Sequence, residues 1–515
     1  MSLNHLVVLP IVLPAITAGL LLLLNRHPNR VRQLSVASVV ALLAVAIALF
    51  VQASTGSYQT YALSDWSAPF GIVMVVDRLS ALLVLITAVV GLAALFYAAQ
   101  GWDTKGKYFH VLFQFQLMGI NGAFLTGDLF NLFVFFEVLL IASYCLLLHG
   151  LGQPRLRAAV HYVAINLTGS AVFLIAVSLL YSVTGTLNMA HVAERVAQAP
   201  AEDIALIRSA GLMLLGVFGV KAALFPLYFW LPAAYSSASA PVAALFAVMT
   251  KVGVYAILRV TTLIYGGESG AAANLLESWI LPVALLTLAL AAIGALAAKR
   301  LTELIAYLTV ASVGTMLVAI SAGGVEGLSG ALFYLMHSTL IVAAMFLLAE
   351  ILGRGRGTVA DTLTAGPHLL QPAFLSISFL LGGAILAGLP LSAGFLAKLM
   401  ILKSVADAPM AAWAWAIILG SSLLTLIGLA RAGSLLIWKT KTPPASDAHR
   451  AGWGQAIPFV ALLACSVLLV VFAVPVKHYA DATAQQLFSP KGYMDSVLSP
   501  GVDRAPRPIP GRSAP

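Results

Sequence analysis

The chain has 515 residues, of which 61% are hydrophobic and only 9% are charged, and its formal net charge is +9. Soluble proteins carry about 25% charged residues, so the composition excludes a water-soluble fold and indicates an all-α polytopic membrane protein. The positive charge does not indicate a nucleic-acid partner. The cations lie mainly in short loops between apolar runs and in the tail, where a membrane protein places them for topology.

About 14 apolar runs follow one another, each about as long as a helix that crosses a hydrocarbon core of roughly 30 Å. The first run has no basic segment before it and is followed by Arg26 and Arg30, so it is predicted to be a true span rather than a signal peptide. The segment 476–515 is predicted to be a polar, Pro-rich tail that is disordered beyond about Ser499. The runs lie at about 3–24, 34–53, 72–98, 110–126, 129–148, 158–183, 208–234, 241–265, 279–297, 303–322, 328–350, 371–403, 410–437 and 455–475.

Basic residues are concentrated in alternate loops. The loops after odd-numbered runs contain most of the Lys and Arg residues, including Arg155 and Arg300, whereas acids such as Glu202 lie in the loops after even-numbered runs. Cytoplasmic loops carry the excess of Lys and Arg, so the odd loops are predicted to be cytoplasmic and both termini to lie outside. The basic tail conflicts with this orientation, but charges far from a span count for less.

Two lysines, Lys221 and Lys251, lie near the middle of membrane-length runs. A cation at the centre of a lipid-facing helix costs about 3 kcal/mol on insertion scales, so both side chains are predicted to face a protein or water interior. Pro226 and Pro232 interrupt the first of the two runs, and a proline inside a helix leaves a carbonyl that needs another partner. Together these features favour a broken helix that lines a hydrated path, as in ion transporters.

Three more ionisable residues, Glu137, His337 and Lys398, lie several residues inside a run. Desolvation disfavours the charged forms of Glu and Lys, while an adjacent opposite charge restores them. A buried pair of Glu and Lys can therefore switch protonation near neutral pH, as a proton relay requires. Pro390 near Lys398 gives a second broken run that corresponds to the one at Pro226, which is a sign of the repeated halves common in transporters.

Some residues have a structural interpretation beside the functional one. On residue type alone, His337 fits a hydrogen-bonded packing residue as well as a proton carrier. Asp128, between the fourth and fifth runs, is predicted to cap a helix. Cys145 and Cys465 lie in separate apolar runs, and the sequence contains no Walker loop, no GxGxxG and no HExxH. No cofactor and no metal site is therefore predicted.

Three segments carry a resemblance to a known family: GINGAFLTGDLFNLFVFFEVLLIASY, KAALFPLYFWLPAAY and ALFAVMTKVGVYAILR. They resemble the D-type component of the Mrp-type multisubunit monovalent cation/proton antiporters, which is similar to the antiporter-like membrane subunits of respiratory complex I. The resemblance covers about residues 70 to 440. It implies 14 helices, with two inverted five-helix repeats and broken helices 7 and 12. The implied parts are helices 1–3 in 1–109, the first repeat in 110–265, the second repeat in 279–440, helix 14 in 455–475 and the tail in 476–515.

The resemblance also implies that Glu137, Lys221, Lys251, His337 and Lys398 transfer protons. Glu137 and Lys221 would form a mutually stabilising pair, and Lys251 would pass protons along a mid-membrane axis toward His337 and Lys398. The implied protein is not an enzyme but a proton-translocating subunit of an antiporter complex in a bacterial inner membrane. It would exchange protons for Na⁺, with K⁺ and Li⁺ as alternatives, beside partner subunits of the A, B, C, E, F and G types.

The chain departs from the family pattern at one position of the implied relay. Several relatives carry a lysine five residues beyond the histidine, where this chain has Val342, so a relay there must use His337, water or another group. The alternative interpretation is an N- or M-type pump subunit of complex I or of a membrane-bound hydrogenase. The M-type subunit typically has a glutamate where this chain has Lys398, whereas the N-type shares the lysine and remains the nearest competitor.

Overall fold

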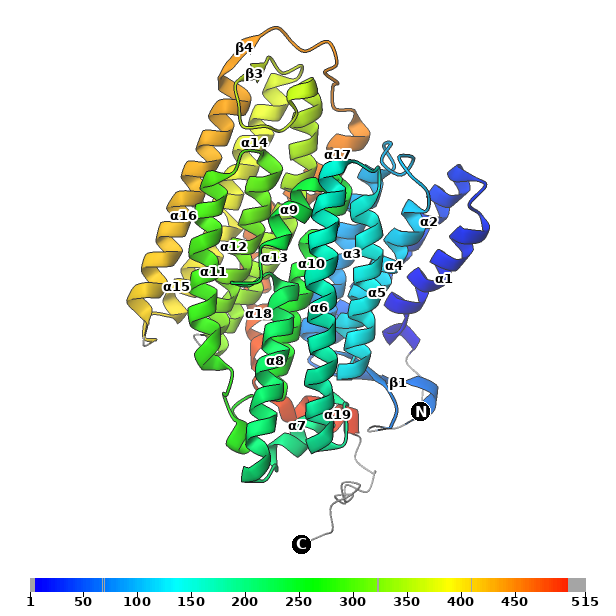
Figure 1. Ribbon diagram of the computed structural model, residues 1–515, viewed down its shortest axis with the longest axis vertical. Coiled ribbons are helices and arrows are strands. Elements are labelled where there is room, and N and C mark those ends of the chain that lie inside the picture. Colours follow the sequence, from blue (N-terminus) through cyan, green and yellow to red (C-terminus); the bar gives the residue numbers. More distant parts are fainter. Residues whose placement is uncertain (1–4, 67, 69, 322–323, 409, 499–515) are drawn as a thin grey trace.

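The computed structural model describes residues 5–66, 68, 70–321, 324–408 and 410–498. Long helices stand side by side in one bundle (Figure 1). In this described part, 11 helices are long and apolar enough to cross a membrane. Three shorter apolar helices, Leu9–Leu23, Phe109–Leu125 and Pro372–Ala387, accompany them. The prediction of a polytopic helical membrane protein is confirmed at this level.

The helices follow the predicted apolar runs in order, and most of their ends agree with the predicted ends within a few residues. The first group comprises α1 (Leu9–Leu23), α2 (Pro28–Ala53), α3 (Arg78–Ala98), α4 (Phe109–Leu125), α5 (Leu129–Leu148), α6 (Gln153–Thr184), α8 (Ile204–Ala222), α9 (Trp230–Ser237) and α10 (Ala240–Leu263). The second group comprises α11 (Glu277–Ala297), α12 (Leu301–Ser321), α13 (Gly324–Gly355), α14 (Pro372–Ala387), α15 (Ala393–Ser404), α16 (Ala411–Gly433) and α17 (Trp453–Val471).

Smaller elements gather at the two ends of the bundle. At the lower end in Figure 1 lie the antiparallel strands β1 (Gln59–Ala62) and β2 (Val73–Val76) and the short helices α7 (Met189–Ala197) and α19 (Pro490–Leu498). At the upper end, β3 (Gly366–Pro367) pairs with β4 (Thr440–Thr442) in parallel. Strand β2 occupies the beginning of the predicted run 72–98, so the helix there starts later than the hydropathy indicates.

The segment predicted as a polar tail contains two helices, α18 (Ala473–Leu487) and α19, before the described residues end at Leu498. Helix α18 packs along the bundle, where the Tyr479 hydroxyl donates to the carbonyl of Arg78 at 2.8 Å. The Ser329 hydroxyl of α13 donates to Asp481 at 2.5 Å. The predicted disorder beyond Ser499 concerns residues outside the described part.

Helices α10 and α13 form the centre of the bundle. All residues of their most apolar 18-residue windows are buried, and the two helices pack against each other. The corresponding windows of α2 and α17 are only 33% and 28% buried, because these helices lie at the periphery. A polar side chain on α10 or α13 is therefore enclosed by protein on every side, as the interior-facing lysines and histidine require.

Candidate functional site

The first helix break separates α8 from α9. Helix α8 ends at Ala222 and α9 begins at Trp230, and Pro226 lies in the segment between them. Pro232, which was also predicted to interrupt this run, lies in the first turn of α9, a position that tolerates proline because no helical bond to its nitrogen is needed there.

Neighbouring side chains satisfy backbone groups that the first break exposes. The Trp230 indole donates to the carbonyl of Val220 at 3.1 Å, and the backbone N–H of Phe225 donates to the Thr287 hydroxyl at 2.9 Å. An unpaired backbone group at membrane depth costs several kcal/mol, so these bonds allow the break to persist inside the bundle.

Lys221 is buried on the last turn of α8 and contacts helix α6. Its Nζ donates to Asn166 Oδ1 at 3.3 Å. On the same helix, the Ser170 hydroxyl bonds to Glu137 of α5 and to the carbonyl of Asn166. No ion pair within 4.0 Å joins Glu137 to Lys221 among the described residues. The implied pair is therefore indirect, with Asn166 and Ser170 between its members.

Lys251 lies at the junction between the two groups of helices. It is 1% exposed on α10, and its Nζ donates to the Ser312 hydroxyl of α12 at 2.9 Å. Two residues further along α10, a β-carbon on Gly253 would lie 2.4 Å from the backbone nitrogen of Ala222. Helix α10 thus approaches the broken end of α8 as closely as a glycine permits, and Lys251 lies between α8 and α12.

The second break, residues 388–392, separates α14 from α15 and contains Pro390. Gly388 has a φ of +76°, a left-handed conformation that favours glycine. Lys398, on α15, donates from Nζ to the carbonyl of Ala387 at 3.0 Å and to the Ser422 hydroxyl at 2.9 Å. The lysine thus binds the negative end of the interrupted helix α14.

His337 lies on α13 beside the second break and is 1% exposed. A β-carbon on Gly394 would lie 2.6 Å from its Nε2, so α15 passes directly against the imidazole. Its Nδ1 is buried and has no hydrogen-bond partner among the described residues. Helix α13 packs against both α15 and α10, so His337 lies on the helix that connects the second break with the centre of the bundle.

The structure places the five predicted residues in two clusters. Glu137, Lys221 and Lys251 lie around the first break, and His337 and Lys398 lie around the second. In the described part no hydrogen bond joins Lys251 to His337. Across this gap, α10 packs against α13, which is where a relay needs water or a side-chain movement.

Several polar partners were not identified from the sequence. Asn166, Ser170, Ser312 and Ser422 are neutral residues in apolar runs, a pattern that equally describes ordinary interhelical packing. Another omission is a buried ion pair. Arg259 of α10 donates to Asp77, which precedes α3, at 2.6 Å. The signal that could have revealed Arg259 is its spacing of eight residues from Lys251 on one helix.

Two further expectations can be compared with the structure. Asp128 is the N-cap of α5, because its Oδ1 accepts the backbone N–H of Asn131 at 2.8 Å, and the predicted capping role is confirmed. Within the described ranges, no group of three or more His, Cys, Asp or Glu side chains is arranged to hold a metal ion.

The helical bundle, its two interrupted helices and the interior lysines beside the breaks define a membrane protein of the broken-helix transporter type. The family model described as NADH:quinone oxidoreductase/Mrp antiporter, TM, matches residues 126–426. A probable K⁺/H⁺ antiporter protein of the D type from Rhizobium meliloti (strain 1021) is 40% identical, with 96% of this chain and 98% of the relative covered. The D-type component of a Na⁺/H⁺ antiporter from Alkalihalophilus pseudofirmus is 36% identical over 96% of this chain and 99% of the relative.

Solved structures show the same similarity. The fold matches a chain of the Mrp complex from Dietzia sp. DQ12-45-1b with a TM-score of 0.87 and 26% identity, covering 97% of this chain and 100% of that chain. A chain of the membrane-bound sulfane sulfur reductase, an archaeal respiratory membrane complex, matches with a TM-score of 0.87 and 26% identity, covering 96% and 100%. The chain belongs to the transmembrane family of NADH:quinone oxidoreductase and Mrp antiporter subunits.

Proposed function

We propose that the protein is the proton-translocating D-type component of a multisubunit monovalent cation/proton antiporter in a bacterial inner membrane, and that it is not an enzyme. The observation that carries the proposal is the row of buried and half-buried Glu, Lys and His residues at two helix breaks, in a chain that is 40% and 36% identical to two D-type antiporter components. These relatives are named for K⁺ and for Na⁺ respectively, so the exchanged cation is Na⁺ or K⁺, with Li⁺ as a further candidate. Its partners are the other subunits of the complex.

The proposed architecture has 14 membrane crossings, the sum of the 11 long and three shorter apolar helices. In this arrangement α8 and α9 together are helix 7, and α14 and α15 together are helix 12. The five-helix repeats are α4–α10, residues 109–263, and α11–α16, residues 277–433, which differ by a few residues from the expected 110–265 and 279–440. Their inverted relation is supported by the count of crossings: each repeat has five, an odd number, so α11 enters the membrane from the side opposite to α4.

In the proposed mechanism, a proton moves between the two clusters through alternating protonation of buried groups. Ser170 and Asn166 connect Glu137 electrostatically to Lys221. Lys251, held by Ser312, receives the proton next. His337 and Lys398 complete the row. Because each protonation changes the field at its neighbours in a medium of low dielectric constant, the groups titrate as coupled sites.

The experiment that tests this proposal replaces Glu137 in the whole complex. We expect Glu137→Gln to abolish cation-dependent proton movement in everted membrane vesicles while the complex still assembles, because an uncharged amide cannot accept the proton. Glu277→Gln is the matched control, since Glu277 is exposed at the start of α11 and lies outside the proposed row. Full antiport in assembled Glu137→Gln complex would show that the relay assignment is wrong.

The orientation of the chain in the membrane is part of the proposal. Arg155 lies at the upper end of α6 in Figure 1, and Glu202 precedes α8 at the lower end. In a chain whose Cys145 and Cys465 are replaced by alanine, a cysteine near Arg155 should react with an impermeant thiol reagent only from the cytoplasm. One near Glu202 should react only from outside. The reverse pattern would contradict the assignment that places both termini outside.

A second candidate function is that of an antiporter-like pump subunit of complex I or of a membrane-bound hydrogenase. The description of the matched family includes NADH:quinone oxidoreductase, and a respiratory complex has the same TM-score as the Mrp complex, so fold alone does not separate the two. The composition of the purified native complex distinguishes the two candidate functions. Iron–sulfur or quinone signatures would support the redox class, and a colourless assembly of small membrane subunits would support the antiporter.

A further inference from the structure

Helix α10 carries a line of polar residues that begins at Lys251 and continues beyond the proposed relay. Lys251, Tyr255 and Arg259 are spaced by four residues and therefore share one face of the helix. Tyr255 donates to the carbonyl of Phe124 at 2.9 Å, and Arg259 Nε donates to the Tyr255 hydroxyl at 3.4 Å. This line leads from Lys251 to the lower end of the bundle in Figure 1, where α7 and α19 lie.

The line ends in a buried ion pair. Arg259 is 4% exposed and Asp77 is 1% exposed. One oxygen of Asp77 accepts from Arg259 at 2.6 Å, while the other caps α3 by accepting the backbone N–H of Ser80 at 2.8 Å. Burying two charges costs several kcal/mol per ion before their attraction is counted, so such a pair is weak support for stability alone. Its place directly below Lys251 and Tyr255 suggests an electrostatic role.

Helix α19 covers this pair with an aromatic ring. The guanidinium of Arg259 lies 5.0 Å from the centroid of Tyr493 and 5.3 Å from that of Tyr255, so it is held between two rings. Both distances are within the range of cation–π attraction, which strengthens when the cation is desolvated. Tyr493 is itself buried and packs edge-on against Tyr58.

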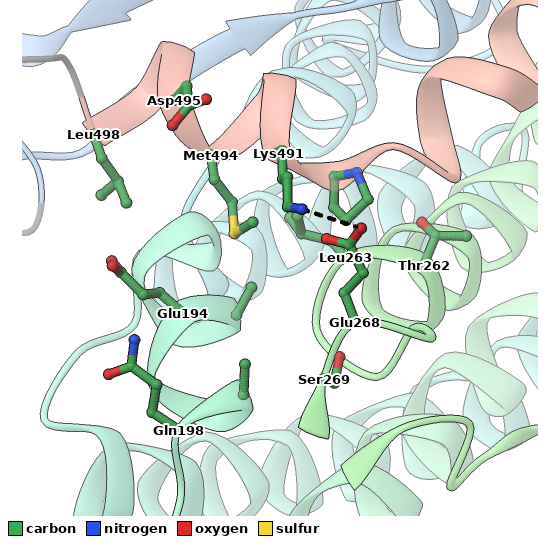
Figure 2. A pocket seen from close by; sticks show the side chains of 13 residues that line it. Glu194, Gln198, Thr262, Leu263, Glu268, Ser269, Lys491, Met494, Asp495 and Leu498 are labelled. Atoms are coloured by element: carbon green, nitrogen blue, oxygen red, sulfur yellow. Dashed lines mark ion pairs between the residues drawn. The ribbon is translucent and has the colours of Figure 1, made fainter. Parts of the chain in front are cut away.

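On its other side, α19 forms the wall of a cavity of about 350 Å³ (Figure 2). The lining includes Glu194 of α7, Thr262 of α10, and Glu268 and Lys491, whose charged atoms lie 3.8 Å apart. The cavity is open to solvent, because the side chains of Lys491 and Glu268 are 77% and 51% exposed. Thr262 follows Arg259 by three residues, so the cavity wall lies within one helical turn of the buried pair.

We propose that this acidic cavity is the outward mouth of the path from Lys251, and that Tyr493 closes it by packing on the Asp77–Arg259 pair. Arg259 cannot release its proton, so it is a positioning residue whose fixed charge opposes the passage of a cation. Asp77 offsets that charge. Displacement of α19 would admit water from the cavity to Tyr255 and connect Lys251 with the outer face. The direction of proton flow through this mouth and its outward orientation rest on the proposed function, but the closure of the cavity by Tyr493 does not.

The first test measures accessibility and needs no transport. In the whole complex, with Cys145 and Cys465 replaced by alanine, Tyr255→Cys should react slowly with an impermeant thiol reagent added from the outer face. Adding Tyr493→Ala should accelerate the reaction by about tenfold, since the lost contact is a desolvated cation–π pair. Tyr493→Phe, which keeps the ring, should not accelerate it. Thr262→Cys, on the cavity wall, should react rapidly in every background.

Rapid labelling of Tyr255→Cys with Tyr493 intact would overturn the proposal, because the ring would then not close the path. Equal labelling with Tyr493 and with Tyr493→Ala in assembled complex would also overturn it. If the wild-type complex showed no antiport while Tyr493→Ala still accelerated labelling, the proposed function would fail and the mouth would remain established. The two claims are therefore tested separately.

The second test measures coupling in everted vesicles. Tyr493→Ala should raise proton leak in the absence of Na⁺ and K⁺ severalfold, whereas Tyr493→Phe should leave the leak at the wild-type level. Asp77→Asn removes the negative charge of Asp77 but keeps a side-chain oxygen that can cap α3. We expect this variant to lose antiport by about tenfold or more without added leak, because Arg259 then opposes the proton with its charge unbalanced. Tight coupling in assembled Tyr493→Ala complex would contradict the proposal.

Discussion

The two interrupted helices have the same form but hold their lysines in different surroundings. At the α8–α9 break, Lys221 precedes the interruption and contacts side chains of α6, behind which lies the carboxylate of Glu137. At the α14–α15 break, Lys398 follows the interruption and binds the carbonyl of Ala387 and the Ser422 hydroxyl. The first lysine is near an acid, whereas the direct partners of the second are neutral oxygens.

This difference indicates how a proton would be distributed between the halves. When Lys221 is protonated, Glu137 can balance its charge, so the pair is close to neutral. When Lys398 is protonated, its partners in the described part, the Ala387 carbonyl and the Ser422 hydroxyl, compensate the charge as dipoles. An opposite charge stabilises a buried ion more than a neutral hydrogen-bond partner does. We therefore expect the first half to retain a proton and the second half to release it, which gives the row a direction.

The largest effect is expected at Lys251, the residue that joins the halves. If Lys251 carries protons, both Lys251→Arg and Lys251→Ala should abolish antiport, because arginine keeps its charge but cannot release the proton in the working pH range. If Lys251 supplies only a static field, the arginine variant should retain most activity. The measurement is the pH dependence of antiport in everted vesicles, with assembly verified for both variants.

Lys403→Arg is the matched control for this substitution. Its side chain is 75% exposed near the end of α15, so the same chemical change there should leave antiport unaltered. Substantial activity in the Lys251→Arg complex would refute the carrier role. The two halves would then differ only in the static electric fields around their lysines.

A smaller effect is expected where glycines allow the helices of each half to approach the breaks. Gly253→Ala would place a β-carbon 2.4 Å from the backbone of Ala222, and Gly394→Ala would place one 2.6 Å from the His337 ring. Backbone yields less easily than a side chain, so Gly253→Ala should lower antiport and thermal stability of the complex more than Gly394→Ala. Overpacking of this kind typically costs about 1–3 kcal/mol.

Gly216→Ala is the control for both glycine variants. It also lies on a broken helix, α8, but a β-carbon there would meet no atom within 4 Å. Its thermal stability should be unchanged or slightly higher, since alanine favours the helix. Equal loss in Gly253→Ala and Gly216→Ala would show that close approach of α10 to α8 does not support the first break.

The sequence indicated the apolar helices, the two breaks and the interior positions of the five ionisable residues, because charge and proline in apolar runs are expensive and therefore informative. The part of these residues in proton transfer stays a prediction. It did not indicate Asn166 or Ser422, since a neutral polar residue in a membrane helix is common and inexpensive. Nor did it indicate that Asp77 meets Arg259, because that contact joins segments 182 residues apart in sequence and depends on tertiary packing. The helices of the tail were missed because their composition is polar and their partners lie elsewhere in the chain.

The smallest predicted effects concern the serine hydroxyls that bind a charged residue in each half. Ser170→Ala removes the hydroxyl that touches Glu137, and Ser422→Ala removes one of the two oxygens that hold Lys398. Hydrogen bonds to charged groups contribute about 1.5–3 kcal/mol in soluble proteins, and those between membrane helices average about 0.6 kcal/mol. Lys398 keeps the Ala387 carbonyl after the change, so Ser422→Ala should slow antiport by about threefold.

Ser170→Ala should slow antiport by about tenfold, because this hydroxyl joins Glu137 to α6, the helix that contacts Lys221. Rates of cation-dependent proton movement, normalised to assembled complex, measure both effects. Ser178→Ala, on the exposed face of α6 where the hydroxyl bonds to its own helix, is the control and should match the wild type. If Ser422→Ala were the more damaging substitution, the second half would depend on its neutral partner more than the first depends on its acid, and the inferred direction of the row would be reversed.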